Sequence, residues 1–139
     1  KVGEDDMKLT TEQEELLVVL VAVEDYKTDK KYKSNELLDK IGDLGMEENG
    51  FYMDEQIDDF KALKSNNLIK FECEDWDKDE EIDDYIISPI TYIEVLDKGR
   101  DYIRHMSDSK IIKVWEAIKG YLSNLNVSMD SLIKIEFNL

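Results

Sequence analysis

Residues 16–23 form an unbroken apolar run, and this run constrains the fold more than any other feature of the chain. Thr11 followed by Glu14 matches the capping-box pattern of a helix start, which predicts a helix despite the β-branched residues. A helix that is apolar on every side must be buried on every side. It is therefore expected to be either the central helix of the domain or half of a contact between two subunits. The run is far shorter than the roughly 20 apolar residues of a membrane span, so no membrane association is expected.

The chain has 139 residues, with 34 acidic and 18 basic side chains and a net charge of −16. Its 42% apolar content is too high for a disordered acidic tail, and its length suits one domain. We expect residues 7–139 to form this domain, and residues 1–6 to be a disordered or expression-derived extension. Cys73 is the only cysteine, which excludes an internal disulfide and indicates a reducing compartment, the cytoplasm.

Helical spacing predicts two further helices before the first strand. Ser34 is expected to cap a short helix, and a third helix is expected from about residue 54 to residue 66. Asn66 and Asn67 suit a left-handed exit from this third helix. The inward positions of the two helices are Leu37, Leu38, Ile41, Ile57, Phe60 and Leu63.

The hydrophobic period then changes from helical to two. Residues 69–73 alternate between apolar and charged, which is typical of a half-buried strand. A second strand-like segment covers residues 85–95, where Pro89 requires an edge position or a bulge. The polar residues 75–84 lie between them, so the unit is predicted to be a hairpin with a long tip.

The C-terminal part is predicted to be mainly helical. Asp97 is expected to cap one helix, and Ser107 or Asp108 a longer one. The inward positions of these helices are Tyr102, Ile103, Ile111, Ile112, Trp115, Ile118, Leu122 and Leu125. In the tail, Ile133, Ile135, Phe137 and Leu139 alternate with polar residues, which predicts a terminal strand, with a short helix capped by Ser128 as the alternative.

Three helices, a strand, a long loop, a second strand and a helix follow one another in the order of a winged helix-turn-helix. Residues 92–103 (YIEVLDKGRDYI) resemble the hydrophobic-L-T-x-x-G-x-x-Y-hydrophobic segment by which many bacterial winged-helix proteins leave the wing. Residues 54–69 and 92–118 resemble the small YjcQ-type winged-helix family of bacterial and prophage genomes. The resemblance implies an α+β winged helix-turn-helix with a β-hairpin wing and C-terminal helices, in a bacterial host cell.

The charge on the two elements with which a winged helix reads DNA is opposite to what DNA requires. The face of the third helix opposite its buried stripe carries Asp54, Glu55, Asp58, Asp59, Ala62 and Ser65. The predicted wing, residues 72–84, holds nine acidic residues and one basic residue. Because DNA binding gains free energy when protein cations displace condensed counterions, direct DNA binding through these elements is disfavoured.

The same surface suits a protein groove lined with Lys and Arg. It predicts a non-enzymatic protein that binds and inhibits or modulates a nucleic-acid-binding protein by mimicking DNA. Trp76 is a candidate anchor, since Trp is enriched among interface hot spots. The family resemblance further implies a phage anti-defence factor. The predicted partner-binding residues are Asp54, Glu55, Asp58, Asp59, Glu74, Asp75, Trp76, Asp77, Asp79, Glu80 and Glu81.

Three alternatives stand beside this hypothesis. Acidic segments are often only solvated loops that keep a protein soluble. A winged-helix transcriptional regulator could instead contact DNA through a minor basic face. A homodimer could form through the N-terminal and C-terminal helices. The lysines of the minor basic face are Lys27, Lys30, Lys31 and Lys33.

The sequence contains no recognisable catalytic or cofactor motif. Residues 75–86 space their carboxylates as an EF-hand loop does, but Glu80 stands where Gly is needed and Ile86 where a bidentate Glu is needed. His105 and Cys73 are the only His and Cys, which excludes a zinc site built from those ligands. No phosphate-binding or nucleophile-elbow motif is present. We therefore expect no enzymatic activity, no cofactor and no dedicated metal site.

Overall fold

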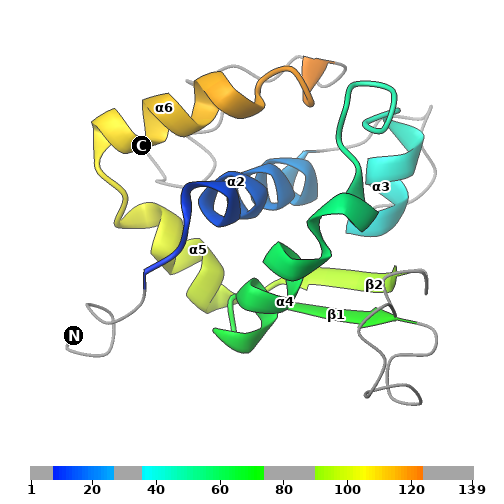
Figure 1. Cartoon of the computed structure of the whole chain (residues 1–139), viewed down its shortest axis with the longest axis horizontal. Helices are drawn as coiled ribbons and strands as arrows, with labels where there is room; N and C mark the ends of the chain where they lie inside the picture. Colours follow the sequence, from blue (N-terminus) through cyan, green and yellow to red (C-terminus); the bar gives the residue numbers. More distant parts are fainter. Residues whose placement is uncertain (1–7, 27–35, 74–89, 124–139) are drawn as a thin grey trace.

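The computed structural model describes residues 8–26, 36–73 and 90–123 (Figure 1). They form an α+β structure of helices and a two-stranded antiparallel sheet, which is compatible with a winged-helix-like arrangement. The elements are α2 (Thr11–Asp25), α3 (Leu37–Asp43), the 3₁₀-helix η1 (Met53–Gln56), α4 (Ile57–Ser65), β1 (Ile69–Cys73), β2 (Ile90–Val95), α5 (Asp97–Arg104) and α6 (Asp108–Ile118).

Several predicted features lie outside the described residues. They are the Ser34 cap, the wing loop 75–84 with its EF-hand-like spacing, the strand segment 85–89 with Pro89, the side chain of Cys73, Leu125 and the tail 126–139. Among the described helices, none is both long enough and apolar enough to cross a membrane.

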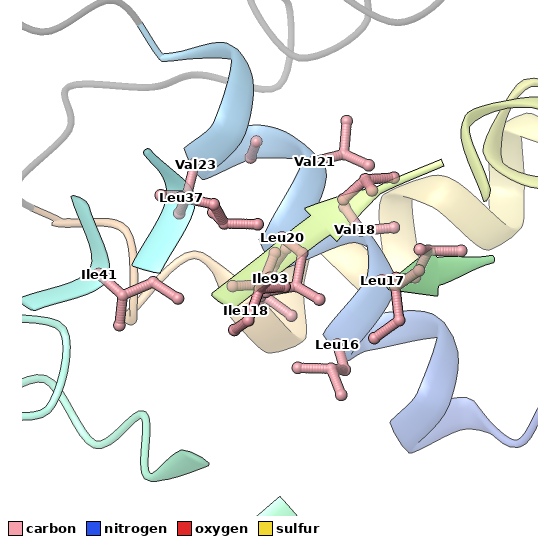
Figure 2. Close-up of a cluster of buried hydrophobic side chains, with 14 of the residues drawn as sticks. Leu16, Leu17, Val18, Leu20, Val21, Val23, Leu37, Ile41, Ile93 and Ile118 are labelled. Atoms are coloured by element: carbon pink, nitrogen blue, oxygen red, sulfur yellow. The ribbon is translucent and has the colours of Figure 1, made fainter. Parts of the chain in front are cut away.

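The apolar run forms the central part of α2. Each of the eight side chains from Leu16 to Val23 is at most 2% exposed, because α3, α4, α5, α6 and β2 all contact α2. Figure 1 shows α6 on one side of α2, and α4 with the two strands on the other. The buried cluster also includes Ile93 of β2 and Ile118 of α6 (Figure 2). The prediction of a central helix is confirmed, and α2 has no apolar face left for a subunit contact.

The start of α2 lies one residue from its predicted position. The N-cap is Thr10, whose Oγ1 accepts a hydrogen bond from Gln13 N at 3.1 Å, while Gln13 Oε1 accepts one from Thr10 N at 3.1 Å. The predicted pair Thr11 and Glu14 is therefore wrong, since Thr10 and Gln13 fit the same capping pattern one residue earlier.

The shift leaves Glu14 free to point toward α5 and α6. Glu14 is 3% exposed, and its Oε2 accepts hydrogen bonds from the Tyr102 hydroxyl at 2.7 Å and from Lys110 Nζ at 3.0 Å. Burial and the bond to Glu14 raise the pKa of Tyr102 to about 12. The phenol therefore stays protonated and donates to the carboxylate across the neutral pH range.

The C-terminal end of α2 is stabilised by a buried lysine. Lys40 of α3 is 3% exposed, and its Nζ donates to the carbonyl oxygens of Val23 (3.3 Å), Glu24 (2.8 Å) and Tyr26 (2.6 Å). These carbonyls lie at the end of a helix, where backbone acceptors lack intrahelical partners and where the helix dipole favours a cation. Burial lowers the pKa of Lys40, and the nearby Glu24 and Asp25 carboxylates oppose that shift.

Arg100 ties the same end of α2 to α5, and Glu24 ties it to the sheet. Its guanidinium pairs with Asp25 at 2.7 and 2.8 Å and also with Glu24. The Glu24 carboxylate in turn accepts a hydrogen bond from Val95 N at 3.1 Å. The planar fork of Arg suits such a two-carboxylate contact.

The region of the third helix follows the prediction, with one difference at its start. Instead of one helix from residue 54, the 3₁₀-helix η1 precedes α4. Asn67 has a φ of 62°, which confirms the left-handed exit. Ahead of it, α3 begins after Glu36. The predicted inward residues Leu37, Ile41, Ile57, Phe60 and Leu63 are buried, and Leu38 is partly buried.

The two strands pair in the predicted antiparallel sense. Ile69 lies opposite Val95 and Phe71 opposite Ile93, and the register is irregular between Glu72 and Cys73. The buried side chains Ile69, Phe71, Ile93 and Val95 therefore lie on one face of the sheet.

The two C-terminal helices correct the sequence analysis at two points and decide between two predicted caps at a third. The N-cap of α5 is Leu96, with Asp97 as the first helical residue, so the predicted Asp97 cap is wrong. Of the two candidates, Ser107 caps α6 by accepting from Lys110 N at 3.2 Å. Ile112 is 50% exposed rather than inward, because it lies about 100° around the helix from Ile111. The buried stripe is Ile111, Val114, Trp115, Ile118 and Leu122.

Close packing of α5 on the sheet gives a test of the fold. A Cβ added to Gly99 would lie 2.5 Å from Leu68 O and 3.3 Å from Leu17 Cδ1, so Gly99→Ala is expected to lower the free energy of unfolding by about 1 to 3 kcal/mol. Gly42 in α3 is the control, because a Cβ there meets nothing within 4 Å, and Gly42→Ala should stabilise by up to about 1 kcal/mol. Urea unfolding measures both changes. A Gly99→Ala variant as stable as the parent would contradict this packing.

Candidate functional site

The described part of the predicted binding surface is the acidic face of η1 and α4. Asp54, Glu55 and Asp58 are exposed, as predicted. Asp59 is not: it is half-buried against α2, where the Gln13 side chain hydrogen-bonds to it. On a helical projection Asp59 lies at the margin between the exposed face and the buried stripe, so packing against α2 decides its position. The wing residues Glu74, Asp75, Trp76, Asp77, Asp79, Glu80 and Glu81, and the basic residues Lys27, Lys30, Lys31 and Lys33, lie outside the described residues.

The lysines of α4 do not reverse the charge of this face. Lys64 Nζ donates to Phe71 O at 3.4 Å and lies 4.9 Å from the centre of the Phe71 ring. Its ammonium group is therefore directed at β1 of the same chain. Lys61 is only partly exposed. The outermost positions of α4 are Asp58 and Ser65, which a neighbouring molecule would meet first.

A pocket of about 270 Å³ opens beside this face, between α2, η1 and α4. Leu16 and Val19 of α2 contribute apolar side chains to it, and Phe51 and Tyr121 contribute aromatic rings. The two rings pack edge to face with their centres 5.5 Å apart and an angle of 61° between their planes. Tyr52, which is 41% exposed, also lines the pocket.

Four carboxylates from three different elements also line the pocket. They are Glu12 and Glu15 of α2, Glu55 of η1 and Asp59 of α4. Burial raises the pKa of Glu15, and the charges of Glu12 and Glu14 raise it further. Burial also raises the pKa of Asp59, with Glu12 and Asp58 adding to the shift and the Gln13 hydrogen bond opposing it. None of the described residues that line the pocket is basic, so the site has a negative potential.

Sequence reasoning missed this pocket. Glu12, Glu15 and Val19 share one side of α2 by their helical spacing, and that pattern was the available signal. Nothing local indicates that Tyr121 packs against Phe51, because the two residues are distant in sequence.

No three His, Cys, Asp or Glu side chains of residues 8–26, 36–73 and 90–123 are arranged to hold a metal ion. His105 is exposed at the end of α5, with its Nδ1 2.8 Å from Asp101 O.

Comparisons with protein-family models, with curated proteins and with solved structures gave no significant match.

The raised pKa of Asp59 leads to a prediction about stability. Folding disfavours the charged carboxylate, so this cost is present at pH 7 and disappears as the pH falls through the raised pKa. We expect Asp59→Asn to increase the free energy of unfolding at pH 7, by less than about 1 kcal/mol because the group is only partly buried and solvent still screens its charge. The gain should shrink toward pH 3.

Thermal unfolding across this pH range measures the effect, with Asp54→Asn at an exposed position of η1 as the control. An Asp59→Asn variant less stable than the parent at pH 7 would show that the Gln13 hydrogen bond outweighs the cost of burial.

Proposed function

We propose that this protein is an acidic, non-enzymatic winged-helix protein, related to the YjcQ-type family, that binds and inhibits or modulates a nucleic-acid-binding protein. In this proposal η1 and α4 take the place of the DNA-reading helix, and the hairpin of β1 and β2 takes the place of the wing. The order of these elements and the antiparallel pairing of the strands support the assignment.

The observation that carries the proposal is the charge of the η1 and α4 face. Asp54, Glu55 and Asp58 are all exposed there, while the nearby Lys64 is engaged with Phe71 of its own chain. A helix that read DNA would present cations and amides to phosphates and bases. Exposed carboxylates repel phosphate and attract a groove that is lined with Lys and Arg.

The composition of the wing supports the same proposal. Residues 72–84 contain nine acidic residues and one basic residue, and Glu72 in β1 is exposed. Together with the α4 face they would supply a negative field that accelerates encounter with a basic partner and weakens as salt is added. A role as a phage anti-defence factor, acting on a bacterial nucleic-acid-binding protein, is the most specific form of this proposal, and it depends on the family resemblance.

Charge reversal at two positions of the η1 and α4 face tests the function. The immobilised protein is expected to retain a nucleic-acid-binding protein from a bacterial lysate, and excess duplex DNA should release it. Asp54→Lys with Asp58→Lys should lower that retention by about tenfold or more, because two attractive charges become repulsive. Glu47→Lys with Glu48→Lys is the matched control, since both glutamates are exposed and lie on the turn after α3.

Two results would count against the proposal. One is retention of the partner that is insensitive to the Asp54 and Asp58 reversals. The other is a gel shift at low salt in which the protein itself retards duplex DNA, which would favour a DNA-binding regulator instead.

A further inference from the structure

We propose that Asn49 is a site of spontaneous deamidation, at which this asparagine is converted into aspartate and isoaspartate without an enzyme. Asn49 and Gly50 form the only Asn-Gly pair in the sequence. They lie in the turn after α3, where Gly50 is exposed and Asn49 is partly exposed. This chemistry is independent of the proposed function, because it involves only the turn and water.

The reaction joins the side chain of Asn49 to the backbone nitrogen of Gly50. After this nitrogen has lost its proton to water or hydroxide, it bonds to Asn49 Cγ, the bond from Cγ to Nδ2 breaks, and ammonia leaves. The product is a cyclic succinimide, which water then opens. Opening at Cγ restores the ordinary backbone and gives aspartate. Opening at the main-chain carbonyl carbon of Asn49 gives isoaspartate, in which the backbone runs through Cβ and Cγ.

The surroundings of Gly50 leave its nitrogen room to react. Glycine has no Cβ beside the attacking nitrogen, and a Cβ built on Gly50 would be 3.7 Å from Tyr121 Cε1, an ordinary van der Waals distance. The Gly50 N–H donates to Glu47 O at 3.0 Å, and this bond has to open first. Because Glu47 and Gly50 are both exposed, opening the turn costs little compared with unfolding the chain.

The side-chain amide of Asn49 is loosely held. Its Nδ2 donates to Tyr121 O at 3.4 Å, whereas Asn66 Nδ2 donates to Ala62 O at 2.9 Å. The longer distance is beyond the usual range for an N–H···O hydrogen bond, so the contact is weak. The Asn49 side chain is therefore free to turn toward the backbone nitrogen that follows it.

The two other asparagines of the described residues are poorer sites. Asn66 is followed by Asn67, and Asn67 by Leu68, so a side chain stands beside the attacking nitrogen in both cases. Leu68 is also buried, and its N–H donates to Leu63 O at 3.0 Å. The fold thus provides internal controls for the reaction at Asn49.

Deamidation changes both the charge and the contacts of the turn. The new carboxylate cannot donate to Tyr121 O, and it adds negative charge beside the exposed Glu47 and Glu48. In isoaspartate, the added backbone atom comes shortly before Phe51, which is 2% exposed and packs edge to face on Tyr121 at 5.5 Å. The modification is therefore expected to loosen the contact between this turn and the segment after α6.

Incubation of the folded chain at about 37 °C and pH 8, in water labelled with heavy oxygen, tests the site. Peptide mass spectrometry then gives the conversion at each asparagine, and the label separates conversion during incubation from conversion during digestion. We expect Asn49 to convert at least about tenfold faster than Asn66 or Asn67. The rate should rise with pH, because the Gly50 nitrogen loses its proton before it attacks.

Two glutamine variants provide the second measurement. Asn49→Gln keeps the amide but places it one carbon farther from the backbone, which disfavours ring closure. The turn peptide of this variant should take up less than about a tenth of the label that the parent takes up. Asn66→Gln is the matched control and should leave the uptake at Asn49 unchanged.

Three results would overturn the inference. One is conversion of Asn49 at the same rate as Asn66 and Asn67. Another is equal uptake of label in the turn peptides of the parent and the Asn49→Gln variant. The third is conversion of Asn49 in urea but not in the folded chain, which would show that the hydrogen bond from Gly50 N to Glu47 O protects the turn.

Discussion

The described structure depends on burying α2 from every side. Eight consecutive apolar side chains with at most 2% exposure leave no direction in which this helix can face water, so the other elements have to surround it. Polar groups then stabilise its two ends, through Thr10 and Glu14 at the start and Lys40 at the finish. Because α4 covers α2 with its Ile57, Phe60 and Leu63 face, its opposite face is left to solvent.

Two groups of acidic residues have different roles. Glu14, Glu24 and Asp25 lie against the core and pair with Lys110 or Arg100, so they connect helices that are distant in sequence. The acids of η1 and α4 lie at the surface or around the pocket. None of the described residues that line the pocket is basic. Lys40, Arg100 and Lys110 are therefore engaged at internal contacts, and negative charge remains on the face that the proposed function requires.

Sequence periodicity predicted the parts of this structure that local spacing determines. The buried stripe of α4, the alternation in β1 and the left-handed Asn67 each follow from a few neighbouring residues. The overlapping capping patterns of Thr10 with Gln13 and of Thr11 with Glu14 cannot be distinguished from the local sequence. The burial of Glu14 depends on contacts with α5 and α6, which are distant in sequence. The exposure of Asp54, Glu55 and Asp58 was predicted correctly. The partial burial of Asp59 and the presence of the pocket were not predicted, because contacts with α2 and Tyr121, which are distant in sequence, determine them.

The central claim is that exposed carboxylates of η1 and α4 occupy a protein groove in place of nucleic acid. Competition tests it most directly: the fluorescence anisotropy of a labelled duplex, bound to the captured partner, is followed while this protein is added. The account predicts that anisotropy falls to the value of free duplex, and that excess unlabelled duplex displaces this protein in return. A ternary complex, in which anisotropy rises or stays constant while this protein binds, would contradict it.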